Sequence, residues 1–366
     1  MVAPSDEDEP NKCGGIHEGQ PDVILSFKAS RGKVKPVNNP VILASNHTGI
    51  SRAERKPDGT WTVERHAPDH QVTCLASDPA NPQNLVAGTT SGVLRSHDRG
   101  STWQRSGMEG QIVKSLAISP HDSRVIYAGT KPALMFVSQD GGNTWSELEG
   151  FRRIPNRWWW FSPAEPPDRR PYVISIALSP TDENVVLAGV EFGAVVRSDD
   201  GGQTWSRHVS GALRDCHSLK FHATDGNWVY QAGGTGGGAS YSQNGGLSFQ
   251  KAKQGLAKNY GITCAADPEN PKTWYVCVAP SPFKAFGENP ETYLYRAADG
   301  GGWQPVGWDP HPLNTSPTVL TTVPGQPGHL YAGLYNGEIW FTEDHGDSWE
   351  KMPIRFGSIW TSLLVI

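Results

Sequence analysis

An aspartate and a histidine two positions apart are the residues of this chain with the clearest potential for chemistry. Asp215 and His217 stand where an apolar, strand-like stretch begins. Residues two apart on a strand point to the same face, so the carboxylate can orient the imidazole as a general base or a metal ligand. Glu191, at a predicted loop tip, would act as a general acid if it were buried nearby. We therefore take Glu191, Asp215 and His217 as candidate catalytic residues, against the alternative that the histidine is structural.

A predicted loop between residues 150 and 172 combines five arginines with three consecutive tryptophans. Guanidinium groups pair with carboxylates or phosphates, and indole rings stack on sugar faces. With Trp158–Trp160 as a partial lid, this loop and lysines from other loops would bind an anionic or sugar-like ligand. The candidate substrate-binding residues are Lys131, Arg153, Trp159, Arg169, Arg170, Tyr172 and Lys284. The alternative is that the tryptophans form the loop's own small core and the arginines are solvated.

Two further patterns bear on cofactors. His47, His70, His217 and His311 lie in different repeats of the chain, and their convergence on a divalent metal is compatible with the sequence, although no spacing supports it. No motif requires a cofactor. The glycine-rich stretch 233–238 lies between two predicted strands with no helix behind it, which disfavours a phosphate-binding loop. We expect it to be a flat connection that leaves room for a ligand or a neighbouring loop.

Six copies of one short phrase reveal the elements that must position these side chains. Each copy runs from Ser or a relative through Asp, Gly-Gly and Thr to Trp, and the closing aromatic residues are 42, 60, 44, 54 and 46 residues apart. A period in the forties is typical of a four-stranded unit in a propeller. The copies are Ser96–Trp103, Ser138–Trp145, Ser198–Trp205, Ser242–Phe249, Ala297–Trp303 and Thr342–Trp349.

Each copy predicts a tight turn between two strands. Glycine adopts positive φ without strain, the Asp side chain can accept hydrogen bonds from the amides that follow, and the Trp ring can pack over the turn. We therefore expect these aspartates to be structural, with no role in catalysis or metal binding.

These phrases resemble the Asp-box, or BNR, repeats of sialidase-like β-propellers, sortilin-type receptors and photosystem assembly factors. The resemblance extends from about Val41 to the C-terminus and implies an all-β propeller. Arg153-Ile154-Pro155 is similar to the Arg-Ile-Pro of sialidases, which supplies a sialate-binding arginine. In that family the phrase precedes the first Asp box, whereas here it follows two, and the Tyr/Glu nucleophile pair has no counterpart. We therefore do not expect a true sialidase.

A second repeated sequence pattern indicates the number of blades. Small residues that suit crowded inner strands align at Cys74, Ser115, Ser175, Ser218 and Thr263, and a sixth copy starts at Thr318. The segment from Val41 has the outer strands of a further unit but no inner strand, and the chain ends in an unpaired strand over 358–366. We predict that this C-terminal strand closes a seven-bladed β-propeller and removes two exposed edges. The alternative is six blades with a separate N-terminal hairpin.

Composition and charge restrict the classes of partner and the cellular location that we expect for this protein. The 366 residues carry a net charge of −5, which argues against nucleic-acid or membrane binding, and no apolar run is long enough to span a membrane. Residues 1–23 read as a disordered acidic tail without a secretory signal, and 24–366 as the propeller. The odd set of five cysteines, without CxxC spacing, favours reduced thiols in a cytoplasmic protein.

Two functions follow from these patterns. The first is an enzyme, similar to a glycoside hydrolase or a lyase, that acts on an anionic or sugar-like small molecule at the axial mouth of the propeller. The second is a non-catalytic binding or assembly module whose Trp/Arg surface holds a peptide, glycan or protein partner. We favour the enzyme, because the functional residue types occur in several blades. The sequence leaves the substrate, the reaction type and the oligomeric state open.

Overall fold

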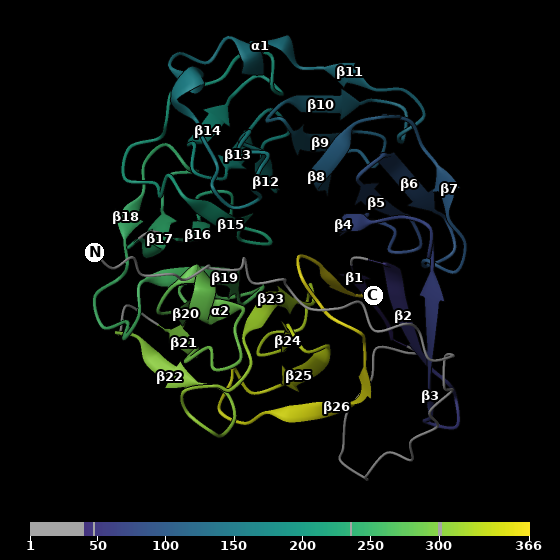
Figure 1. The fold of residues 1–366 in the computed structure, drawn as a ribbon, viewed down its shortest axis with the longest axis vertical. Coiled ribbons are helices and arrows are strands. Elements are labelled where there is room, and N and C mark those ends of the chain that lie inside the picture. Colours follow the sequence, from purple (N-terminus) through teal and green to yellow (C-terminus); the bar gives the residue numbers. More distant parts are fainter. Residues whose placement is uncertain (1–39, 47, 235, 299–301) are drawn as a thin grey trace, which may run out of the picture.

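Seven antiparallel sheets follow one another along the chain and stand in a ring around a central axis (Figure 1). The computed structural model describes residues 40–46, 48–234, 236–298 and 302–366. The seven-bladed β-propeller predicted from the repeats is confirmed, and the six-bladed alternative is excluded. The predicted tail over 1–23 lies outside the described residues, and the propeller is observed from Val41 onward.

The blades are built in chain order from inner to outer strands, except for the first. Blade one contains β27 (Leu363–Val365), β1 (Val41–Asn46), β2 (Gly49–Arg55) and β3 (Trp61–His66). Blades two to four contain β4 (Val72–Ser77), β5 (Leu85–Thr89), β6 (Gly92–Ser96) and β7 (Gln104–Arg105); β8 (Ile112–Ile118), β9 (Ile126–Lys131), β10 (Met135–Ser138) and β11 (Ser146–Glu147); and β12 (Val173–Leu178), β13 (Val186–Val190) and β14 (Val195–Ser198). Blades five to seven contain β15 (Cys216–Phe221), β16 (Val229–Gly233), β17 (Gly238–Ser242) and β18 (Gln250–Lys251); β19 (Tyr260–Ala266), β20 (Trp274–Ala279), β21 (Tyr293–Ala297) and β22 (Gln304–Val306); and β23 (Pro317–Thr322), β24 (Leu330–Leu334), β25 (Glu338–Thr342) and β26 (Glu350–Arg355).

The ring closes through the C-terminal strand, as predicted. Strand β27 pairs with β1, with Leu364 opposite Leu43, and the Ile366 amide donates to the Val41 carbonyl at 2.9 Å. The strand itself is short, because only Leu363–Val365 are paired, whereas Ile359 is buried against Gly333 of blade seven. Closure thus joins segments more than 300 residues apart, and β27 covers the inner edge of β1.

Close packing between blades explains the small residues of the second repeated sequence pattern. Ser115 Oγ on β8 donates to the Val173 carbonyl of the next inner strand at 2.8 Å, and Ser175 Oγ repeats the contact with Leu219 at 3.1 Å. A side chain at Gly129 would approach Ser115 Oγ to 2.5 Å and Val173 Cβ to 2.6 Å. The inner strands therefore approach each other too closely for larger residues.

The Asp boxes form hydrogen-bonded turns. Asp140 accepts hydrogen bonds from the Thr144 amide at 2.9 Å and the Thr144 hydroxyl at 2.6 Å, while Ser138 donates to it at 2.8 Å. The Trp145 indole donates to the Ser106 carbonyl of blade two at 2.8 Å, so the turn also anchors the neighbouring blade. These contacts support the predicted structural role of the box.

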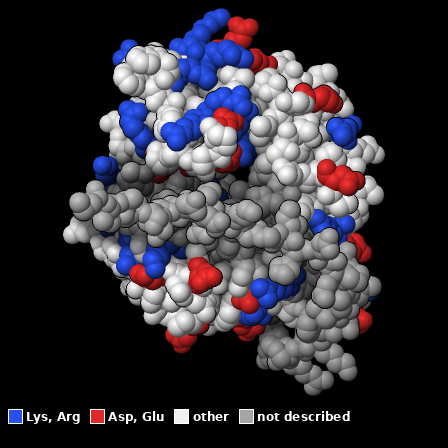
Figure 2. Space-filling model, in the orientation of Figure 1, with Lys and Arg blue, Asp and Glu red and all other residues white. Residues whose placement is uncertain are grey.

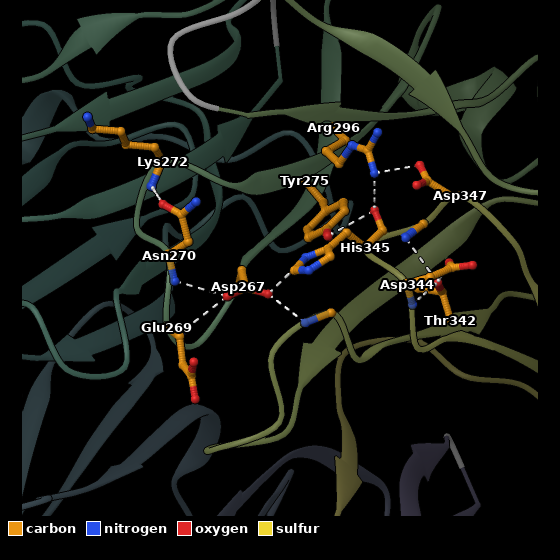
Figure 3. A network of polar contacts seen from close by, with 12 residues as sticks. Asp267, Glu269, Asn270, Lys272, Tyr275, Arg296, Thr342, Asp344, His345 and Asp347 are labelled. Carbon is orange, nitrogen blue, oxygen red and sulfur yellow. Dashed lines mark hydrogen bonds and ion pairs between the residues drawn. The ribbon is translucent and has the colours of Figure 1, made fainter. Parts of the chain in front are cut away.

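A polar network joins blades six and seven on the side of the Asp boxes (Figure 3). Asp267, which is buried, accepts hydrogen bonds from the amides of Gly328 at 2.7 Å and Asn270 at 3.0 Å, and lies 3.2 Å from His345 Nδ1. His345 replaces a glycine of its Asp box, and Arg296 donates to its carbonyl at 2.8 Å. Blade six is thereby fixed to the last Asp box.

The remaining expectations from composition concern thiols and membranes. Cys74, Cys216, Cys264 and Cys277 are buried and free, whereas Cys13 lies outside the described residues. No helix in the described part of the chain is long and apolar enough to cross a membrane. The cytoplasmic location stays a prediction.

Candidate functional site at the axial mouth

The end of the propeller opposite the Asp boxes carries the candidate site. Inner strands begin and second strands end there, whereas the Asp-box turns follow the third strands at the other end. One backbone hydrogen bond repeats at this end: the Glu191 amide donates to the Tyr172 carbonyl, and the Gly234 amide to the Asp215 carbonyl, both at 3.0 Å. Glu191 and Gly234 thus occupy corresponding positions in blades four and five, as do Tyr172 and Asp215.

Glu191, Asp215 and His217 meet in one cluster, which we call the axial triad. His217 Nε2 lies 3.4 Å from Asp215 Oδ1 and 3.8 Å from Glu191 Oε1. His217 Nδ1 donates to the Gly261 carbonyl at 2.6 Å, which fixes the ring with Nε2 toward the two carboxylates. The side chains of Glu191 and Asp215 are 7% and 6% exposed, and the His217 side chain is 12% exposed. The histidine is therefore the member most accessible to a ligand.

The position of His217 has a different local origin from the one expected. Strand β15 begins only at Cys216, and a β-bulge between Cys216 and Ser218 leaves His217 as the extra residue. A bulge re-aims a side chain relative to simple alternation. The two side chains meet as expected, but through this bulge.

The pKa values of Glu191 and His217 are both raised within the triad. Burial raises the pKa of Glu191 to about 7, an effect that the nearby His217 opposes and the Asp215 charge reinforces. Burial disfavours the charged form of His217, but the hydrogen bond with Asp215 and the Glu191 charge outweigh it and raise the pKa to about 9. Between these values, Glu191 is ionised and His217 is protonated. The Glu191 carboxylate can then accept a proton while the neighbouring His217 imidazolium donates one.

The glycine-rich stretch leaves room for this arrangement. A Cβ on Gly234 would lie 2.2 Å from Asp215 Oδ2, 2.8 Å from His217 Cε1 and 2.9 Å from Tyr260 Cε2. The Tyr260 ring lies 4.9 Å from the His217 ring, tilted by 56°. Close backbone approach therefore requires glycine here, in agreement with the flat connection expected from the sequence.

A second charged group adjoins the triad on blade three. Lys114 and Lys131 both donate to Glu165, at 2.6 Å and 2.7 Å, and their ammonium groups lie 5.0 Å and 5.5 Å from the centre of the Tyr172 ring. Burial raises the pKa of Tyr172, with further contributions from the charges of Glu191 and Glu165. Two predicted ligand-binding residues, Lys131 and Tyr172, thus lie beside the predicted catalytic residues.

The other predicted binding residues make contacts outside the triad. Arg153 is exposed and pairs with Glu149 at 3.2 Å, and Arg170 pairs with Asp168 at 2.8 Å. The Arg169 guanidinium lies 5.6 Å from the centre of the Phe161 ring. Lys284, in the short helix α2 (Pro282–Ala285), pairs with Glu291 at 3.1 Å. Their part in ligand binding stays a prediction.

The tryptophan loop divides into two parts. It contains helix α1 (Glu149–Arg152) and a 3-10 turn, Arg157–Trp159, and Lys and Arg side chains gather over this upper part of the molecule in Figure 2. Trp160 packs against Phe151, as the core-filling alternative requires. Trp158 and Trp159 stack on each other with 72% and 70% exposure, and therefore offer a free aromatic surface.

The axial triad is also where a divalent metal could be held. One ligand atom from each member lies within 4.8 Å of the others. Among the described residues, the triad is the one cluster of three His, Cys, Asp or Glu side chains with this spacing. It includes neither His70 nor His311, and His47 lies outside the described residues. A depression of about 350 Å³ elsewhere, lined by His66, Asp69, His70 and Trp103 among others, does not reach the triad.

Sequence reasoning missed Lys114, Glu165 and Tyr260 as parts of this candidate site. Lys114 is the extra residue of the bulge between Val113 and Ser115, just as His217 is in blade five. The alignment of Ser115 with Ser218 would have placed both residues at the same point of their repeats. That repeat position was the signal available for Lys114.

Comparison with known proteins supports the Asp-box repeats found in the sequence. Residues 196–207 match the BNR/Asp-box repeat. The xyloglucanase Xgh74A of Acetivibrio thermocellus is 35% identical over 100 residues, covering 22% of this chain and 12% of that protein. The photosystem II assembly lipoprotein Ycf48 of Synechococcus sp. (strain CC9902) is 22% identical over 285 residues, covering 76% and 74%. The match thus spans about an eighth of the xyloglucanase but about three quarters of Ycf48.

Solved structures share the fold. An ancestral GH74 enzyme superposes with a TM-score of 0.62 at 16% identity, covering 89% of this chain and 47% of that one. YCF48 bound to a D1 peptide superposes with a TM-score of 0.55 at 13% identity, covering 87% of each chain. The chain is a seven-bladed β-propeller that carries Asp-box repeats, and the proteins similar to it include both glycan-degrading enzymes and an assembly factor.

Proposed function

We propose that the protein is an enzyme that uses the axial triad for acid–base chemistry on a sugar-like or anionic substrate. The observation that carries this proposal is the contact between Glu191 and His217, which come from different blades. Their pKa values are raised to about 7 and about 9. Perturbed titratable groups of complementary protonation are characteristic of acid–base sites.

Each member has a role that its contacts support. These roles are the reverse of those expected from the sequence, because Glu191 is ionised and His217 is protonated between about pH 7 and pH 9. The Glu191 carboxylate would remove a proton, from water in a hydrolysis or from carbon in an elimination. The His217 imidazolium would donate a proton from Nε2 to the departing oxygen. Asp215 would hold the imidazolium in place, assisted by the hydrogen bond from Nδ1 to Gly261. The similarity to xyloglucanases favours a glycan substrate.

Turnover on a panel of glycans tests this proposal. Purified full-length protein is incubated with xyloglucan, neutral plant glycans and uronate-containing glycans, and both new reducing ends and the ultraviolet absorbance of new double bonds are measured. We expect turnover that falls roughly 100-fold or more in Glu191→Gln and His217→Gln. Glu149→Gln, an exposed carboxylate paired with Arg153, is the matched control and should behave as wild type. Equal rates in all four proteins would reject the assignment.

The second candidate is a peptide-binding assembly module. It is favoured by the Ycf48 match over a comparable chain length and by the exposed pair Trp158 and Trp159. If this function holds, peptides should alter the fluorescence of the wild type, and a double Trp158→Ala, Trp159→Ala variant should lose binding. His217→Gln would then bind as the wild type does. Loss of peptide binding in His217→Gln alone would contradict this candidate.

A further inference from the structure

The lysine pair beside the triad belongs to the blade framework, whereas the anion between the lysines comes from a loop. Lys114 is a bulge residue of inner strand β8, and Lys131 ends β9. Glu165 lies in the long connection between β11 and β12. The cations are thus held by paired strands, and the carboxylate that bridges them is held by no regular element.

The burial of Lys114 and Lys131 requires an anion between their ammonium groups. The Lys131 side chain is 2% exposed and that of Lys114 is 16% exposed, whereas Glu165 is 41% exposed. A buried ammonium group is costly without a counter-charge. The Glu165 carboxylate provides that charge to both lysines at 2.6–2.7 Å, and Lys131 also donates to the Asp168 carbonyl at 2.9 Å. Another carboxylate in the same place would satisfy the pair equally.

This lysine pair lies next to the triad and not in a separate region. Lys131 ends the second strand of blade three, and Glu191 directly follows the second strand of blade four. Tyr172 connects the two groups: its ring faces both lysines, and the charge of Glu191 acts on its hydroxyl. Tyr260 contacts His217 on the other side. A ligand carboxylate held by the lysines would therefore lie beside the triad.

We propose that Lys114 and Lys131 form the binding site for the carboxylate of an acidic sugar, a uronate, and that Glu165 holds this place until the substrate displaces it. This inference rests on the proposed function, since it names the substrate class of the same site. The exchange replaces one carboxylate by another and makes or breaks no covalent bond. The loop that carries Glu165 thereby acts as an internal competitor.

Binding measurements test the inference independently of turnover. Isothermal titration calorimetry compares D-galacturonate oligomers with the matching neutral galactose oligomers on the full chain. We expect Glu165→Gln to bind the acidic oligomer about ten-fold or more tightly than the wild type, because the competing charge is lost. The control Glu149→Gln should leave affinity unchanged. Lys131→Met should lose the preference for the acidic oligomer, and Lys114→Gln provides a second variant should Lys131→Met not fold.

The outcomes separate this inference from the proposed function. Retained acidic binding in His217→Gln together with lost turnover supports both. Tighter binding in Glu165→Gln without any turnover in the wild type supports the lysine site and rejects the enzyme. Equal affinity of wild type and Glu165→Gln, equal affinity for neutral and acidic oligomers, or preference for an acidic peptide would overturn the uronate site.

Discussion

Replacing Glu191 by glutamine should lower the pKa of His217. The His217 Nε2 and Glu191 Oε1 atoms are 3.8 Å apart, and two unit charges at that distance attract by about 4 kcal/mol at an effective dielectric constant of about 20. Glu191 is ionised where His217 titrates, since its pKa of about 7 lies below the value of about 9 for the histidine. At about 1.4 kcal/mol per pH unit, we expect a decrease of about one to three pH units.

Nuclear magnetic resonance of protein labelled in the histidine rings measures this directly. The chain has 12 histidines, so the His217 signal is identified by its loss in His217→Gln. Glu149→Gln serves as the control, because its carboxylate lies on the exposed surface. An unchanged His217 pKa in Glu191→Gln, or a wild-type value near that of a free histidine, would refute the reasoning.

Three further predictions concern stability. The pKa of His217 is about 9 in the folded protein against an ordinary 6.5, so its stabilising contribution of about 3 kcal/mol should be present below pH 6.5 and lost as the pH rises through 9. His217→Gln should flatten this part of the curve of unfolding free energy against pH. A curve that is the same in wild type and variant would contradict the raised pKa. Asp200→Ala removes two hydrogen bonds to Thr204 and should lower the free energy of unfolding in urea by about 1–2 kcal/mol without affecting ligand affinity. Deletion of residues 359–366 exposes the edge of β1 and should produce aggregation in sedimentation velocity runs; a monomer of unchanged stability would disprove the closure.

Much of the framework was predictable from the sequence because each blade repeats the same local physics. The Asp box specifies a turn through its own hydrogen bonds, and the small residue at Ser115 or Ser175 follows from the close approach of inner strands. Strand lengths were less predictable. Blade four has three strands where four were expected, and β27 pairs over only Leu363–Val365, because pairing depends on neighbours distant in the chain.

The site was predictable only in part. Glu191, Asp215 and His217 were predicted as candidates from residue type and loop position, but their meeting depends on a bulge and on Gly234, which alternation alone does not predict. Glu165 could not have been found, because its loop has no counterpart in the other repeats and its place is determined by ion pairs across 34 and 51 residues.

The pH dependence of kcat/KM on the glycan that the wild type cleaves tests the central claim most directly. The acid–base assignment predicts a bell-shaped profile with limbs near pH 7 and pH 9, set by Glu191 and His217. Glu191→Gln should abolish the acidic limb and retain only residual activity, while Glu149→Gln should keep both limbs. A wild-type profile that keeps its shape and height in Glu191→Gln would contradict the account.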